Sequence, residues 1–173
     1  MMMKLKEIHE NKELACDDEV LLEGVGYNSL FNTECSVYFD RNKIQIDEAE
    51  RYLEQYINNL DKEMVDKILH LACEWKNEQV KDYPDVDYME GLKQATRREI
   101  MRYIQLCSIH IYKNPYDPND MLLGASVYCV PNWDEENHME IIIKGKEVLE
   151  VREFLGYGEF AIWDESEQNE CKS

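Results

Sequence analysis

The chain has 173 residues, 44% of them hydrophobic, and its 37 acidic residues against 19 basic ones give a formal net charge of −18. This negative excess argues against binding to nucleic acids and anionic lipids, because their phosphates require clustered cations. No stretch reaches the roughly 20 consecutive apolar residues of a membrane-spanning helix. We therefore expect one cytoplasmic domain, of the common size of about 100–200 residues, that binds neither nucleic acid nor membrane.

The patterns along the chain predict three parts. Residues 1–18 are charged and weakly periodic, so we expect a loose arm or a short edge element there. Residues 19–163 are expected to form the single folded domain. Residues 164–173 are polar and predict a disordered tail.

Two strands are predicted at the start of the domain. Residues Glu19–Tyr27 carry spaced apolar side chains. In Thr33–Asp40, cysteine, valine and phenylalanine alternate with serine, tyrosine and aspartate, a period of two that is typical of a strand with one buried face. We expect the pair to form a hairpin around a loop at residues 27–32.

Helical patterns follow the hairpin. Asp47 and Glu50 have the spacing of a capping box, and apolar residues continue on one helical face as far as Leu60. A second helix is predicted to begin near Asp61 and to end before Pro84, because a proline ring cannot continue a helix. The predicted buried stripe of this second helix is Met64, Val65, Ile68, Leu69, Ala72 and Trp75.

A third helix is predicted before the chain returns to strands. Asp87 and Glu90 repeat the capping-box spacing, and apolar residues continue from Leu92 to Ile104. Gly91 in the first turn costs this helix about 1 kcal/mol relative to alanine.

The last third of the chain alternates between strand patterns and turn signals. The proline-rich segment 114–120 predicts a loop, and Gly145 predicts a hairpin turn. The predicted strands are Cys107–Tyr112, Leu122–Val130, Met139–Ile143 and Val148–Phe154. The fold class that we predict is α+β, a largely antiparallel sheet of about five to seven strands with two or three helices packed on one face.

The six cysteines lack a Cys-x-x-Cys pair and are spread evenly along a chain that is long enough to have its own core. This spacing argues against a zinc site and against a disulfide framework. We expect four of them to act as small apolar core residues in a reducing compartment: Cys35, Cys73, Cys107 and Cys129.

Asp66, His70 and Glu74 recur every four residues on the second predicted helix, so their side chains share one face. This spacing suits a carboxylate and imidazole metal site. The alternative, a solvated polar face, is favoured because no other helix offers a matching set.

The densest polar cluster lies between two predicted strands, from Trp133 to Glu140. Its carboxylates and imidazole could act as acid and base or as ligands of a hard cation. They could also form a solvated connection that Trp133 anchors to the core. A third reading is a contact site for a basic protein partner, with Trp133, Asp134, Glu135, Glu136 and His138 as its residues.

The same cluster resembles a signature of an uncharacterised bacterial α+β domain family. Trp-Asp-Glu-Glu-Asn-His-Met-Glu at residues 133–140 is similar to the family's Trp-acid-x-Glu-His-Gly-Leu-Glu, although Asn137 stands in place of its histidine and His138 in place of its glycine. Some members resemble immunity proteins that are encoded beside polymorphic toxins. The supporting segments are Ile100–Ile104, Ser108–Tyr112 and Lys146–Val151.

Two hypotheses for function follow. The first is an immunity-type binding protein, not an enzyme, that needs no metal or cofactor and neutralises a basic partner such as a toxin, with its negative charge steering the encounter. The second is a metal-assisted hydrolase that uses His138 and the neighbouring carboxylates. It requires these side chains to converge. A stand-alone structural domain, whose charge serves only solubility, is the simplest alternative.

Overall fold

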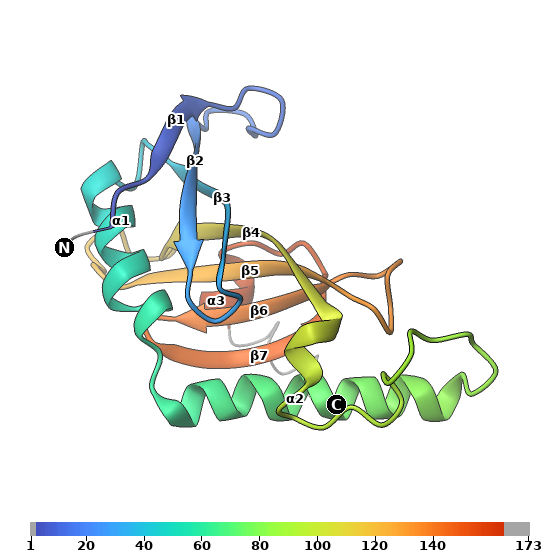
Figure 1. Cartoon of the computed structure of the whole chain (residues 1–173). Helices are drawn as coiled ribbons and strands as arrows, with labels where there is room; N and C mark the ends of the chain where they lie inside the picture. The colour runs from blue at the N-terminus through green and yellow to red at the C-terminus, as the bar shows by residue number, and fades with distance from the viewer. Residues whose placement is uncertain (1–2, 165–173) are drawn as a thin grey trace.

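Seven strands form one mixed sheet in the computed structural model, which describes residues 3–164. The spatial order of the strands equals their order in the chain (Figure 1). The strands are β1 (Lys6–Glu10), β2 (Leu21–Asn28), β3 (Thr33–Asp40), β4 (Ile104–Lys113), β5 (Leu123–Pro131), β6 (Met139–Lys144) and β7 (Glu147–Glu153).

The sheet consists of two antiparallel meanders that meet at one parallel pair. Strands β1 to β3 form the first meander and β4 to β7 the second, while β3 and β4 run parallel with Tyr38 opposite His110. The helical segment between β3 and β4 supplies the crossover that a parallel pair requires. The predicted α+β class with a largely antiparallel sheet is therefore confirmed.

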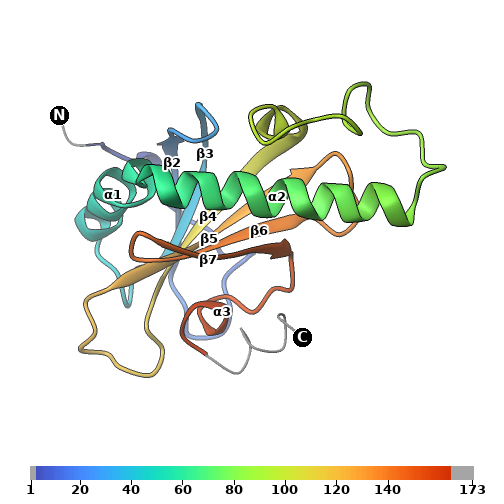
Figure 2. The same cartoon turned by 90° about the horizontal axis from the view of Figure 1, so that it is seen from below.

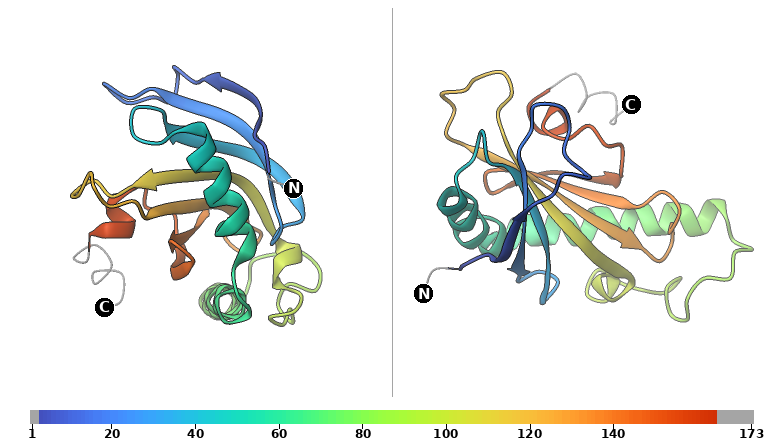
Figure 3. Two further views of the ribbon diagram at one scale, coloured as in Figure 1. Left: turned by 90° about the vertical axis from the view of Figure 1, so that its left-hand side faces the viewer. Right: turned by 90° about the horizontal axis from the view of Figure 1, so that it is seen from above.

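The sheet is strongly twisted. The blue strands of the first meander run steeply across the orange strands of the second (Figures 1 and 3). This is the accumulated twist that L-residues impose between neighbouring strands.

Two long helices cover one face of the sheet and a short helix lies on the other. Helix α1 (Ile46–Gln55) and the 3₁₀ turn η1 (Ile57–Asn59) lead into α2 (Lys62–Asp82), which runs along the sheet beside β7 (Figure 2). Helix α3 (Phe160–Trp163) packs on the opposite face, where Ala161 and Ile162 contact Ile142. No helix among the described residues is long and apolar enough to cross a membrane.

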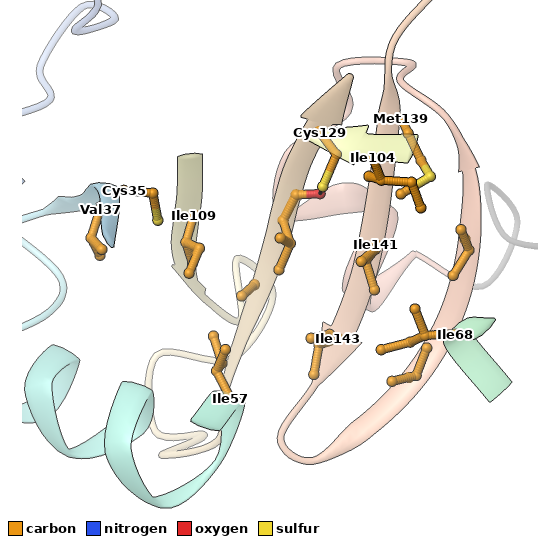
Figure 4. Close-up of a cluster of buried hydrophobic side chains, with 14 of the residues drawn as sticks. Cys35, Val37, Ile57, Ile68, Ile104, Ile109, Cys129, Met139, Ile141 and Ile143 are labelled. Atoms are coloured by element: carbon orange, nitrogen blue, oxygen red, sulfur yellow. Dashed lines mark hydrogen bonds between the residues drawn. The ribbon is translucent and has the colours of Figure 1, made fainter. Parts of the chain in front are cut away.

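The main core lies between the sheet and the two long helices. Val37, Ile109 and Ile141 point from three strands toward Ile57 and Ile68 of the helical layer (Figure 4), and each of these side chains is at most 2% exposed. Burying one such side chain contributes about 1.5–3 kcal/mol.

Three of the four cysteines that were expected in the core are buried, and Cys107 is the exception. Cys35, Cys73 and Cys129 are buried and free, while Cys107 is partly exposed. Cys171 lies outside the described residues, as does nearly all of the tail predicted at 164–173.

The start of α2 agrees with the prediction from the sequence, and the cap of α1 does not. Helix α2 begins next to Asp61, as predicted, and the Asp61 carboxylate caps it by accepting a hydrogen bond from the Met64 amide at 2.9 Å. The capping box of α1 is made by Gln45 and Glu48, so the predicted box of Asp47 and Glu50 was wrong. Glu50 is buried in the helix instead.

Residues 1–18 were expected as a loose arm or a short edge element, and the described part contains an edge strand. The Glu50 carboxylate accepts a hydrogen bond from the Leu5 amide at 3.1 Å and lies 3.2 Å from the Lys4 ammonium. Leu5 is buried, and β1 then pairs with β2. A charged side chain of α1 thus fixes Lys4 and Leu5 just before β1, which is why this segment is not loose throughout.

The predicted third helix does not form. Residues 84–99 are turns and irregular backbone, followed by the 3₁₀ turn η2 (Ile100–Tyr103). Gly91 takes a left-handed φ of 83°, and the buried Lys76 ammonium donates to the carbonyls of Lys93 and Ala95 at 3.3 and 2.9 Å. These carbonyls are therefore held by a side chain of α2, while Leu92 still reaches the core.

Candidate functional site

The sheet face turned away from α1 and α2, here called the second face, carries a row of polar and aromatic side chains. Successive residues of a strand point to opposite faces, so the strands that bury Val37 and Ile109 under the helices present their other side chains here. These residues include Ser36, Tyr38, Ser108, His110, Tyr112, Ser126, Tyr128, Glu140 and Arg152.

Trp133, expected as a contact residue, is buried under α2. Its side chain is 3% exposed, and its ring meets Trp75 edge to face with 5.7 Å between centroids. It therefore cannot contact a partner in this conformation. The burial of Trp133 agrees with the interpretation that this residue anchors the connection between β5 and β6 to the core.

The acidic residues of the connection between β5 and β6 do not converge. Glu135 and Glu136 are exposed, while the Asp134 carboxylate accepts hydrogen bonds from the Asn137 side chain at 3.0 and 3.1 Å. His138, at a left-handed φ of 57°, makes a hydrogen bond through Nδ1 with the Tyr128 hydroxyl. The arrangement that a metal-assisted hydrolase requires is absent from these residues.

Glu140, the last acid of the sequence cluster, belongs to a separate buried network. It is 1% exposed and accepts hydrogen bonds from Arg152 Nε at 2.9 Å and from Ser126 Oγ at 3.0 Å. The Leu155 amide donates to the same carboxylate at 3.4 Å, and Arg152 also contacts Glu150 at 3.3 Å. A buried ion pair with these additional hydrogen bonds holds the segment after β7 against the second face.

The helical metal-site candidate is also satisfied locally. Asp66 lies 3.0 Å from the Lys62 ammonium, and His70 Nε2 lies 3.1 Å from the Glu74 carboxylate, both at helical spacing. Across residues 3–164, no group of three or more histidine, cysteine or acidic side chains has the geometry to hold a metal ion. The Asp66 and Glu74 side chains are exposed, which agrees with a solvated polar face.

A cavity of about 760 Å³, here called the aromatic cleft, opens on the second face. Its floor is formed by Tyr38, His110 and Tyr112, and its walls by residues 14–19 and 156–160. The lining residues come from the loop after β1, from the end of β3 and the turn after it, from the end of β4 and from the segment around α3. The cleft therefore joins four segments that are distant in the chain.

The floor of the aromatic cleft is a row of stacked rings. Tyr38 and His110 stack with 4.7 Å between centroids, and His110 and Tyr112 with 6.3 Å. Burial lowers the pKa of His110 to about 4 and raises the pKa of Tyr112. All three rings are therefore neutral near pH 7.

The walls of the aromatic cleft are acidic, and its rim is apolar. Five carboxylates and two lysines line it: Asp17, Asp18, Glu19, Asp40 and Glu159 with Lys43 and Lys113. At the rim, Leu14, Tyr157 and Phe160 are 57%, 41% and 44% exposed. This site was not predicted from the sequence, although the alternation of Tyr38, His110 and Tyr112 with buried residues was a usable signal.

A smaller cavity of about 330 Å³ lies at the same end of β4, where it shares Lys113 with the aromatic cleft, and is lined by Tyr52, Tyr56 and Leu122 among others. Its charged residues are Glu48, Arg51 and Lys113, so its lining lacks the acidic excess of the aromatic cleft.

Comparison with known proteins gives one match. Residues 9–158 match the model of a domain of unknown function, DUF6985, which covers all seven strands except the first residues of β1. No curated protein and no solved structure matches the chain. Because the match extends over most of the sequence, the chain belongs to the DUF6985 family.

Proposed function

We propose that this protein is an immunity-type binding module that neutralises a basic protein partner such as a toxin. The observation that carries the proposal is the distribution of its charge, which is −18 overall. Carboxylates lie both around the aromatic cleft and on residues 132–138, here called the connection before β6. Complementary charge raises the rate of encounter and fixes the orientation of two partners.

The connection before β6 supports this role through charge and not through an aromatic anchor. Glu135 and Glu136 project from a turn that Asp134 holds through Asn137 and that Trp133 fixes to the core. A rigid turn loses little conformational entropy when a partner binds its exposed side chains.

The test is complex formation with the product of the neighbouring gene. Size-exclusion chromatography and calorimetry would measure whether a complex forms, and co-expression would show whether this protein relieves a growth defect when expression of that product alone causes one. The double variant Glu135→Lys/Glu136→Lys should weaken the complex about tenfold or more at low salt, because both charges reverse sign.

The matched control reverses two exposed acids on α2, Glu63→Lys/Glu78→Lys. It changes the net charge equally and leaves the turn intact, so it separates a local contact from a general effect of charge. Absence of any complex, or equal weakening by both double variants, would contradict a contact at the connection before β6.

A further inference from the structure

The aromatic cleft has the size and lining of a binding site. At about 760 Å³ it falls within the range of about 300–1,000 Å³ that is usual for ligand sites, and it combines apolar rings with a few charged groups. It lies on the second face, away from the connection before β6 that the sequence had singled out.

The charge of the lining decides which kind of group would enter. Five carboxylates against two lysines give the walls a negative balance, while the rings of the floor carry no charge near pH 7. Of the five, Asp17 and Asp18 are exposed and stand on one short loop. An anionic ligand would be repelled, and a cation would be attracted.

The apolar rim indicates that the cation belongs to a larger partner. Leu14, Tyr157 and Phe160 expose about half of their surface around the opening. Exposed aromatic residues beside a charged cleft are characteristic of protein contact sites. A free small cation would leave these side chains in water.

We propose that the aromatic cleft receives an arginine side chain from a basic segment of a partner protein. The aliphatic stem of arginine packs on the ring floor, and its guanidinium reaches the carboxylates of the walls. Arginine fits better than lysine because its planar, weakly hydrated head group pairs with two oxygens at once and stacks on aromatic rings. The choice of a protein partner rests on the proposed function.

The experiment uses the full chain and a short probe, the blocked tripeptide acetyl-Gly-Arg-Gly-amide. Titration is followed by NMR through the ring signals of Tyr38, His110 and Tyr112. The same peptide with citrulline in place of arginine keeps the shape and removes the charge. We expect the arginine peptide to shift these signals and to bind at least about fivefold more tightly than the citrulline peptide.

Two charge-matched variants locate the site. Asp17→Asn/Asp18→Asn should weaken the arginine peptide about threefold or more, since exposed ion pairs each contribute modestly. Glu63→Gln/Glu78→Gln removes the same charge on α2, outside the aromatic cleft, and should leave the affinity unchanged. Equal binding of the two peptides, shifts confined to other residues, or equal weakening by both variants would overturn the proposal.

The outcome is independent of the test of the proposed function. If the arginine peptide binds in the aromatic cleft but the product of the neighbouring gene forms no complex, the proposed function fails and the arginine site stands. If that complex forms but the arginine peptide leaves the three rings unshifted, the arginine site is overturned and the proposed function stands.

Discussion

The two faces of the sheet are made by the same strands and are built in different ways. Under α1 and α2, side chains such as Phe39 and Leu53 meet in an apolar core. On the second face, the buried positions include a carboxylate and a guanidinium, Glu140 and Arg152. The first face gains its stability from the removal of apolar surface from water, and the second combines the small apolar contact of α3 with paired polar groups.

The largest effect is expected on the helix-covered face. Phe39→Ala should lower the free energy of unfolding by about 4 kcal/mol, because the ring is 1% exposed and its removal leaves a cavity. Urea denaturation measures this loss. Phe160→Ala, at a side chain that is 44% exposed, is the control and should cost about 1 kcal/mol or less. Similar losses for both would contradict the assignment of the core.

The second face should show a smaller loss that can be partly recovered. Arg152→Met leaves the buried Glu140 carboxylate without its cation and should cost about 3 kcal/mol. Glu140→Gln in the same chain removes the unpaired charge, so the double variant should regain at least about half of that loss. If the double variant is as unstable as the single one, the network is not held by charge pairing.

The smallest of the three effects depends on pH. The unfolded chain binds a proton at His110 below its ordinary pKa of 6.5, whereas the folded chain does so only near a pKa of about 4. Stability from this group is therefore complete above pH 6.5 and is lost as the pH falls toward 4, by about 2 kcal/mol at pH 5.

His110→Phe removes the titrating group and keeps an aromatic ring in the row. Unfolding measured from pH 8 to pH 5 should therefore show a flatter pH dependence for this variant than for the original chain. Parallel curves for the two proteins would show that His110 takes up its proton equally in both states.

The sequence predicted the strands better than the sites. The alternation of apolar and polar residues correctly predicted the strand at residues 33–40 and the hairpin around Gly145, because one face of each strand is apolar. It failed for the helix expected from Asp87 to Ile104, since the same apolar residues are buried in turns that Lys76 holds. Contacts of this kind join distant segments and leave no local pattern.

The site could be predicted only in part for the same reason. Glu140 was expected to share a cluster with Glu135 and Glu136, but it lies within β6, and the chain after β7 covers it. Nothing in the order of residues 133–140 shows that Trp133 faces α2. The aromatic cleft was missed because its walls come from both ends of the chain and meet only through the sheet order.

The single parallel pair in the sheet has a consequence for how the chain reaches its native state. Each meander consists of neighbours that are close in sequence, so each can pair soon after collapse begins. The pairing of β3 with β4 must wait until the long helical crossover between them has closed, and it joins the short stretch from Ser36 to Tyr38 with the stretch from Ser108 to His110. The Tyr38 and His110 rings stack across this junction, so their contact forms late and would report when the two halves have joined.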